Sequence, residues 1–179
     1  MPDRDPGLVS PDPLLRLADA ADAPAVAAVV HAAYVGYTPL LGRTPLPMLT
    51  DFPAAIADHP VWVLAAGPSI VGVIELIERT DHLWVEDVAI DPAWQGRGLG
   101  RRLLVFADDE ARRLRLPELG LMTNELYARN IAMYERYGYR ETHREPYRGT
   151  DLIHFRKTLH DADAVAHADA ESEPARGAG

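Results

Sequence analysis

The pattern of hydrophobic and polar positions changes period several times along the chain, and each period predicts a different kind of element. Short apolar or alternating runs predict six strands, at 14–17, 61–66, 70–78, 83–90, 121–123 and 152–158. Apolar residues at helical spacing predict four helices, at 25–34, 48–57, 98–114 and 130–137. The order β-α-α-β-β-β-α-β-α-β, with three strands in close succession, predicts an α/β domain that contains an antiparallel meander.

The helix predicted at 98–114 has the clearest stripe, with apolar residues at 99, 103, 107, 111 and 114. Its polar side contains Asp108 and Asp109, each four residues before an arginine, Arg112 and Arg113. Because an acid that precedes a base by four residues stabilises a helix surface, we expect both pairs to face solvent.

Both ends of the chain differ in composition from the middle. Residues 1–13 are rich in proline and aspartate, and residues 160–179 in alanine, acidic residues and glycine, so we expect both to be disordered around a domain at 14–159. Of the formal net charge of −9, these segments hold −2 and −4, which leaves −3 for the domain. Nucleic acid is therefore a poor candidate partner, because phosphate binding requires a concentrated basic face.

Several classes of protein are disfavoured by features that the sequence lacks. No apolar run approaches the roughly 20 residues that cross a bilayer, and the first dozen residues lack the features of a secretory signal, so we expect no membrane span and a cytoplasmic location. The absence of cysteine excludes disulfides, cysteine–zinc sites and a thiol nucleophile. Lys157 is the only lysine, which argues against Schiff-base chemistry and a phosphate-loop lysine. The histidines and serines show no spacing typical of a metal site or a serine hydrolase, so we predict neither.

The stretch most informative about function is VEDVAIDPAWQGRGLGRRLL, residues 85–104, which reads as a strand, an Asp-Pro stop, a glycine-rich loop and a helix. Gly96, Gly98 and Gly100 allow positive φ and a close approach of the backbone to a ligand, so that successive N–H groups can face one concavity. The helix that follows adds unpaired amides and the positive end of its dipole. These features together predict a phosphate or diphosphate site.

Two well-known classes of phosphate site differ from this loop. A phosphate-loop NTPase would need G-x-x-x-x-G-K-[ST], which is absent, and a dinucleotide fold would place the loop after the first strand of a parallel sheet. Here Arg97, Arg101 and Arg102 are available to add positive charge at a phosphate site. The glycines alone are also compatible with a plain start of a helix.

Two motifs together resemble a known family. QGRGLG, Gln95 to Gly100, matches the Q/R-x-x-G-x-G/A signature of the GNAT acyltransferase superfamily and follows a V-A-I-D-P strand, as it does in that family. NIAMYERYGY, residues 130–139, is similar to the family's later helix, which bears a tyrosine and ends in a G-[FY] turn. The resemblance covers about residues 14–158. It implies the GNAT fold, with a central, mixed, mostly antiparallel sheet flanked by helices, and an N-acetyltransferase that uses acetyl-CoA.

The resemblance also implies which residues bind the acetyl donor. Main-chain amides of the loop would hold the diphosphate of CoA; these residues are Gln95, Gly96, Arg97, Gly98, Leu99, Gly100 and Arg101. Main-chain groups of Val88, Ala89 and Ile90 would bind the pantetheine arm, which lies along the strand, and strand amides would polarise the thioester carbonyl. Asn130 is a further candidate, because the family often carries an asparagine near this helix, although usually further from the tyrosine. The alternative is that Asn130 caps the helix.

For the chemistry, the resemblance places Tyr134 as the general acid that protonates the departing CoA thiolate. The alternative is an aromatic side chain on the buried side of a short helix. The attacking amine must be neutral, and Glu86 is the candidate base, directly or through water; alternatively it is an exposed strand residue or a contact for the substrate ammonium. Asp87 lies on the opposite face of the strand, so only one of the two can face the cleft. Transfer would be direct, without a covalent enzyme intermediate.

The acceptor side is expected near the least regular part of the chain. The prolines and glycines from Gly36 to Pro47 predict an irregular loop, and Tyr34 and Tyr37 are candidate substrate-binding residues there. The acceptor, a small-molecule or peptide amine, and the length of the acyl group stay open. Homodimers are common among proteins that this one resembles. The alternative functions are a non-catalytic or regulatory acyl-CoA-binding module of the same fold and a nucleotide-phosphate binder unrelated to CoA.

Overall fold

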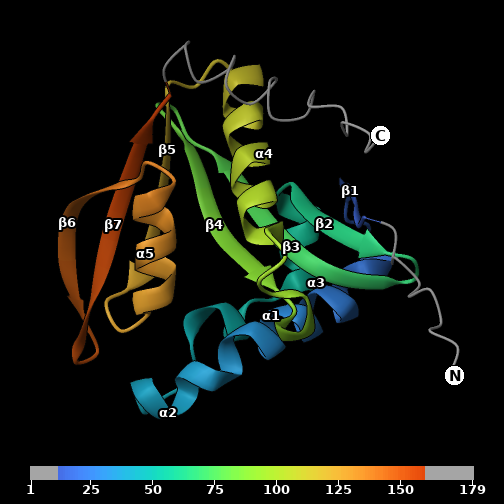
Figure 1. Cartoon of the computed structure of the whole chain (residues 1–179), viewed down its shortest axis with the longest axis horizontal. Helices are drawn as coiled ribbons and strands as arrows, with labels where there is room; N and C mark the ends of the chain where they lie inside the picture. Colours follow the sequence, from blue (N-terminus) through green and yellow to red (C-terminus); the bar gives the residue numbers. More distant parts are fainter. Residues whose placement is uncertain (1–11, 160–179) are drawn as a thin grey trace, which may run out of the picture. The chain divides into compact units, whose positions relative to one another are not determined.

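Seven strands hydrogen-bond in the order β1-β2-β3-β4-β5-β7-β6 in a computed structural model, which describes residues 12–159 (Figure 1). The strands are β1 (Leu14–Leu17), β2 (Val61–Ala66), β3 (Ser69–Glu78), β4 (Leu83–Ile90), β5 (Glu118–Asn124), β6 (Arg140–Tyr147) and β7 (Thr150–Thr158). β4 pairs with β5 in parallel, and the pairs β1/β2, β2/β3, β5/β7 and β6/β7 are antiparallel. The predicted mixed, mostly antiparallel sheet is therefore confirmed. The disorder predicted for the chain ends concerns residues that, apart from positions 12 and 13, lie outside the described part.

The helices fall between the strands nearly as the sequence predicts. The α-helices are α1 (Ala23–Tyr34), α2 (Thr38–Leu41), α3 (Phe52–Asp58), α4 (Leu99–Arg113) and α5 (Ala128–Arg136). Short 3-10 helices are η1 (Ala20–Asp22), η2 (Val35–Tyr37), η3 (Leu46–Leu49) and η4 (Pro92–Trp94). The described residues divide into two compact units, 12–77 with 85–104 and 78–84 with 105–159, so that β4 and α4 each contribute residues to both.

The first unit begins with a capped turn that sets the start of α1. The side chain of Asp19 accepts a hydrogen bond from the amide of Ala21 at 2.8 Å, and Asp22 completes a capping box with the amide of Asp19. Arg16 on β1 holds Asp22 at 2.6 Å. Pro24 then occupies the first turn of α1, where its missing N–H is of no consequence.

The core of the first unit contains buried side chains of the antiparallel ladder of β2 and β3 and of α1, which contacts α3 and η3. Val63 and Val73 face each other across the ladder, and both are fully buried, as are Val26 and Val30 of α1. Each buried aliphatic side chain of this size stabilises the fold by about 1.5–3 kcal/mol relative to exposure.

The second unit is organised around β5. This strand pairs with β4 at Leu83 and Leu119, and with β7 along its whole length. Leu121 of β5 and Phe155 of β7 are paired and buried, and the ring of Phe155 lies beside Tyr134 of α5, 6.2 Å between centroids.

The predicted exposure of Asp108 is wrong. Asp108 is 1% exposed, and its side chain accepts a 2.5 Å hydrogen bond from the ammonium group of Lys157. The surface pairs on α4 instead join Arg112 to Asp109 and Arg113 to Glu110, three residues apart. A helical stripe cannot reveal this difference, because the partner that makes burial of Asp108 tolerable lies 49 residues away on β7.

β6 is a strand that the sequence did not predict. Seven of its eight residues are exposed, it is almost wholly polar, and it contains Pro146. It lies last in the strand order and pairs only with β7 among the described strands, and such edge strands carry charges and proline without a hydrophobic pattern. After α5 the chain therefore forms two strands, β6 and β7, instead of the single strand predicted.

The predictions for the segment before β2 need two corrections. The expected irregular loop at 36–47 contains η2, α2 and the start of η3, with Gly42 ending α2 at a φ of 65°. The helix expected at 48–57 is divided, because Thr50 is extended and Asp51 caps a separate α3 by accepting from the amide of Ala54. The loop prediction relied on the prolines of this segment, but a proline in the first turn of a helix does not interrupt the helix.

The helical run Ala20–Leu41 is long and apolar enough, by length and composition, to suit a membrane span. It is, however, a succession of four segments, η1, α1, η2 and α2, and not one continuous helix. Its side chains Val26, Val30 and Tyr34 are buried in the first unit, as expected for a helix that packs in a folded core.

Candidate functional site

Between β4 and α4 the chain passes through η4 and then through residues 95–98, which we call the glycine turn. The side chain of Asp91 caps η4 by accepting from the amide of Ala93 at 2.8 Å. Gly96 and Gly98 have φ of 77° and 78°, a region that other residues rarely adopt. Apart from chain neighbours, no described atom lies within 4 Å of where a Cβ would stand at either glycine. The turn is therefore open at both positions.

The glycine turn leads directly into the first turn of α4. The first helical backbone bond runs from the amide of Arg102 to the carbonyl of Gly98 at 3.0 Å, so the amides of Leu99, Gly100 and Arg101 precede it. Gly100 lies inside the helix. Amides at the start of a 15-residue helix, together with its dipole, form an environment that favours an anion.

Side chains of the glycine turn brace it against neighbouring backbone. Gln95 donates from Nε2 to the carbonyl of Ile90 at 3.0 Å, which ties the turn to the end of β4. Arg97 donates to the carbonyl of Ala93 at 3.3 Å, and its guanidinium lies 4.5 Å from the ring centroid of Trp94. Because both side chains are engaged in these contacts, the main-chain amides of the turn are the groups best suited to bind a ligand.

The other two arginines considered for phosphate binding differ in their surroundings. Arg102 donates to the carbonyl of Pro13 at 2.6 Å and so holds the segment that precedes β1. Arg101 is exposed on the first turn of α4.

The three predicted pantetheine-binding residues lie at the end of β4. Ala89 is buried, whereas Val88 and Ile90 are half-buried. The carbonyl of Ile90 accepts the bond from Gln95, and the carbonyl of Val88 lies 3.4 Å from the hydroxyl of Tyr34. The first unit thus brings a predicted donor-binding residue next to a predicted acceptor-binding residue.

Tyr34 and Asp87 form a buried hydrogen bond between α1 and β4. The Tyr34 hydroxyl donates to Oδ1 of Asp87 at 2.7 Å, and the two residues are 7% and 8% exposed. The second oxygen of Asp87, Oδ2, is buried without a hydrogen-bond partner among the described residues. The ring of Tyr37 lies 6.2 Å from that of Tyr34, so both predicted substrate-binding tyrosines are neighbours.

The surroundings of Asp87 strongly disfavour its charged form. Burial raises the pKa of Asp87 to about 7, and repulsion from Glu75 and Glu86 adds to the rise. Hydrogen bonds from Tyr34 and from the Val88 backbone act in the opposite direction. Glu86 is exposed on the other face of β4, as the strand alternation predicts.

Glu75 is a second buried acid, which was not among the predicted site residues. Burial raises its pKa, Glu86 raises it further, and His59 partly opposes the rise. The available signal was a lone acidic residue inside an otherwise apolar strand segment, residues 70–77.

The remaining predicted site residues, Tyr134 and Asn130, belong to α5 of the second unit. Tyr134 is 4% exposed, and its ring lies 5.8 Å from that of Tyr139 in an edge-on arrangement. Asn130 is the third residue of α5, and its amide donates to the carbonyl of Tyr127. Tyr127 occupies the position before the helix without a side-chain cap bond, so the alternative that Asn130 caps α5 is wrong.

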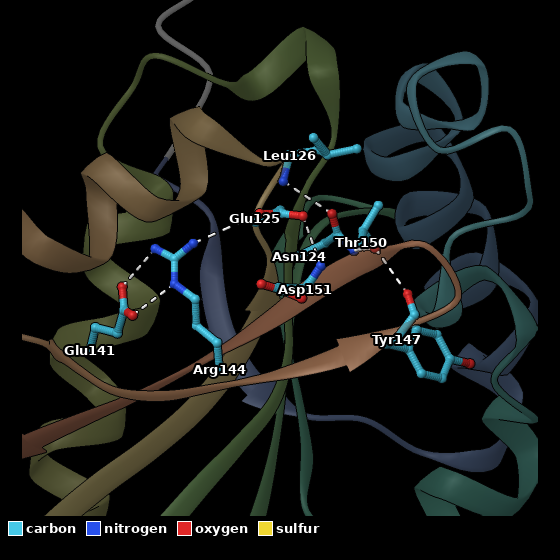
Figure 2. Close-up of polar contacts among 8 residues, drawn as sticks. All are labelled: Asn124, Glu125, Leu126, Glu141, Arg144, Tyr147, Thr150 and Asp151. Carbon is cyan, nitrogen blue, oxygen red and sulfur yellow. Dashed lines mark hydrogen bonds and ion pairs between the residues drawn. The ribbon is translucent and has the colours of Figure 1, made fainter.

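The turn that leads from β5 into α5 is held by polar side chains (Figure 2). Asn124 donates to the hydroxyl of Thr150 at 2.7 Å and accepts from the amide of Leu126 at 3.0 Å, and Thr150 in turn donates to the carbonyl of Tyr147. These bonds join the end of β5 to the turn between β6 and β7. They fix the direction in which α5, with Tyr134, begins.

Glu125 adds a second set of bonds at the same turn (Figure 2). It accepts from the amide of Asp151 at 2.8 Å and lies 3.7 Å from the guanidinium of Arg144, which is paired with Glu141. No local pattern in the sequence marks these residues, because their partners lie on β6 and β7.

Comparison with protein families finds one matching description. Residues 57–141 match the acetyltransferase (GNAT) domain. This segment contains β4, the glycine turn, α4 and α5. No curated protein sequence matches the chain.

Solved structures with the same fold include the ribosomal-protein-S18-alanine N-acetyltransferase from Escherichia coli, at 20% identity and a TM-score of 0.66, covering 81% of this chain and 92% of that one. PaiA N-acetyltransferase from Thermoplasma acidophilum in complex with coenzyme A shares 15% identity, with a TM-score of 0.66 and coverage of 82% and 98%. A GNAT family acetyltransferase from Elizabethkingia anophelis with acetyl-CoA bound shares 19% identity, with a TM-score of 0.54 and coverage of 65% and 92%. The fold expected from the two sequence motifs is thus confirmed.

Proposed function

Residues 57–141 match the acetyltransferase (GNAT) domain, and from this premise we propose that the chain is an N-acetyltransferase that transfers an acetyl group from acetyl-CoA to a primary amine. The observation that supports this most is the glycine turn. Gly96 and Gly98 adopt positive φ with open space at both Cβ positions, immediately before a 15-residue helix. A diphosphate could accept from several amides there without a lysine.

The acetyl donor would bind along the backbone of the first unit. We assign the CoA diphosphate to the amides from Gln95 to Arg101, and the pantetheine arm to main-chain groups from Val88 to Ile90. Asn130 of α5 is a further proposed contact to the donor. Arg101, which is exposed, would add a charge-assisted contact to a phosphate oxygen.

The proposed chemistry is a direct attack of the amine on the thioester carbonyl. A C–N bond forms, the C–S bond breaks, and Tyr134 protonates the departing thiolate. Glu86 offers an exposed carboxylate on β4, which suits it to attract the acceptor's ammonium group or, as the sequence predicts, to accept its proton. Tyr34 and Tyr37 would line the acceptor side. We place the enzyme in the cytoplasm and expect a homodimer.

A second candidate is a non-catalytic acyl-CoA-binding module, and one observation favours it. Tyr134 is almost completely buried and packs against Tyr139 and Phe155, as a purely structural aromatic residue would. The two candidates share the donor site and differ only in turnover.

The proposal is tested by measuring release of free CoA thiol from acetyl-CoA in the presence of a panel of polyamines, aminoglycoside-like amines, amino acids and peptides with free N-termini. Calorimetry with CoA and with ATP runs in parallel. We expect CoA to bind in preference to ATP and at least one amine to be acetylated. Binding of CoA without turnover on any amine would favour the binding module, and preference for ATP would contradict both candidates.

A further inference from the structure

The hydrogen bond between Tyr34 and Asp87 has no evident structural need. A buried carboxylate costs stability unless its oxygens are well paired, and here the Tyr34 hydroxyl and the Val88 backbone hydrogen-bond to Asp87 while Oδ2 has no hydrogen-bond partner among the described residues. An apolar residue at this position of β4 would avoid the cost. Buried, incompletely satisfied acids of this kind are typical of functional sites.

The position of this pair relates it to the predicted donor site. The Tyr34 hydroxyl lies 3.4 Å from the carbonyl of Val88, one of the main-chain groups proposed to bind pantetheine. Tyr34 ends α1, and Tyr37, whose ring is 6.2 Å away, lies in the next helical segment. The Tyr34 hydroxyl therefore lies against the proposed donor strand, and its ring lies beside Tyr37, the other residue proposed for the acceptor side.

We propose that the acceptor ammonium loses its proton to the hydroxyl oxygen of Tyr34 while the Tyr34 proton passes to Asp87, so that Asp87 is the proton acceptor of the reaction and acts through Tyr34. This inference rests on the proposed acetyltransferase function. It transfers the role of base from Glu86, which keeps the role of attracting the ammonium from the exposed face of β4.

The proton balance of the proposed step is complete. One N–H proton of the ammonium ends on Asp87, which later releases it to solvent, and the tyrosine is regenerated as a phenol. The neutral amine then forms the C–N bond as the C–S bond breaks. The thiolate takes a proton from Tyr134, which recovers one from the nitrogen of the new amide. The products are the amide, CoA thiol and one released proton.

The charged neighbours of Asp87 indicate why this acid, rather than Glu86, suits the role. The groups that act on Asp87 are Tyr34 on α1, Glu75 on β3 and, through repulsion, Glu86 on its own strand; His59 acts on Glu75. Burial and the two acids make proton uptake by Asp87 favourable close to neutral pH, and a base is most effective when its pKa lies near the working pH. Glu86, in contrast, is exposed to solvent.

The test is the pH profile of kcat/KM for the best amine acceptor, in the wild type, Asp87→Asn and the matched control Glu86→Gln. We expect the wild-type rate to fall on the acid side with an apparent pKa near 7. Asp87→Asn still accepts the Tyr34 bond but cannot titrate, so it should lose this acid limb and about 10²–10⁴-fold in kcat, with unchanged CoA affinity by calorimetry. Glu86→Gln should keep the limb and change mainly KM.

Tyr34→Phe gives a second readout that a structural role would not produce. Because Tyr34 relays the proton, its loss should lower kcat, and because the Tyr34 bond lowers the pKa of Asp87, Asp87 should titrate at higher pH in the unliganded variant. Infrared titration of the unliganded protein should show a buried carboxyl that titrates near neutral pH and is absent in Asp87→Asn. If Asp87→Asn turns over with an unchanged acid limb, this inference fails while the acetyltransferase function stands; a wild type without turnover on any amine overturns both.

Discussion

The ammonium group of Lys157 on β7 lies 2.5 Å from Oδ2 of Asp108 on α4, and this pair joins the only lysine of the chain to a carboxylate that is 1% exposed. The lysine stem also passes Tyr139, with Nζ 5.8 Å from the ring centroid. Burial and the nearby Asp108 raise the pKa of Tyr139 well above its ordinary value. The pair therefore fixes how α4 packs on the sheet of the second unit.

Removing one partner of this pair should destabilise the protein strongly. Lys157→Met leaves the Asp108 charge buried without its ammonium partner, and we expect the free energy of unfolding to fall by about 3–5 kcal/mol in a urea titration. Arg113→Met, which breaks the exposed pair with Glu110 on the same helix, is the control and should have a much smaller effect. The double variant Lys157→Met/Asp108→Leu should recover most of the loss. Equal losses of unfolding free energy in the two single variants would show that the buried pair contributes no more to stability than the exposed pair.

The glycine turn gives a prediction for donor binding. Gly98→Val forces a β-branched residue into a φ of 78°, which should rotate the turn's amides away from a diphosphate and weaken CoA binding by at least about tenfold in calorimetry. Gly149→Val is a matched control, because Gly149 also has a positive φ, 84°, and open space at its Cβ position, but lies between β6 and β7. The control should lose similar stability and keep its CoA affinity. Unchanged affinity in a folded Gly98→Val protein would contradict the placement of the diphosphate.

Replacement of Tyr134 separates enzyme from binding module. Tyr134→Phe keeps the ring that packs on Tyr139 and Phe155 and removes only the hydroxyl. If the phenol protonates the thiolate, kcat should fall by about 10²-fold, while CoA affinity and unfolding free energy stay close to those of the wild type. The matched control is Tyr139→Phe, whose hydroxyl has no hydrogen-bond partner among the described residues and which should leave kcat unchanged. Equal kcat in the wild type and Tyr134→Phe would leave Tyr134 with a packing role.

The raised pKa of Asp87 predicts how stability depends on pH. The folded protein holds a proton on Asp87 up to about pH 7, whereas the unfolded chain releases it near 3.8, so the folded state binds more protons between these values. The free energy of unfolding should therefore contain a term that decreases as pH rises from 3.8 to 7, on the order of 4 kcal/mol in total.

Asp87→Asn removes this term. The variant should thus be more stable than the wild type at pH 8 and similar to it near pH 4, as measured by urea unfolding at both pH values. A gain in stability combined with a loss of activity is the behaviour expected of a residue kept for function. If the stability difference between variant and wild type does not change with pH, the buried acid does not titrate in this range.

The turn before α5 allows a test of positioning. Asn124→Ala removes the bonds to Thr150 and to the amide of Leu126 at a site that is 5% exposed, and should cost about 1–3 kcal/mol of stability. Because these bonds set where α5 begins, hydrogen exchange of the α5 amides should increase more than that of α1. A uniform increase in both helices would indicate global destabilisation only.

Much of this protein could be predicted from its sequence, because the decisive signals are local. Periodicity located β2 and β4 to the residue, and the Asp-Pro stop and three glycines located the turn before α4, since positive φ and helix starts depend on a few consecutive residues. The GNAT fold followed from two motifs in the correct order. In contrast, β6 was missed, because an exposed edge strand needs no hydrophobic pattern.

The tertiary structure decided which polar residues are buried and what they meet. Asp87 and Glu86 are adjacent in sequence, and strand alternation shows only that they face opposite ways; the arrival of Tyr34 from a distant helix determines that Asp87 is the buried one. Asp108 has the spacing of a surface residue and is buried because Lys157 reaches it from β7. Local sequence sets conformation, but the protonation and pairing of a side chain depend on desolvation and on partners that only folding brings near.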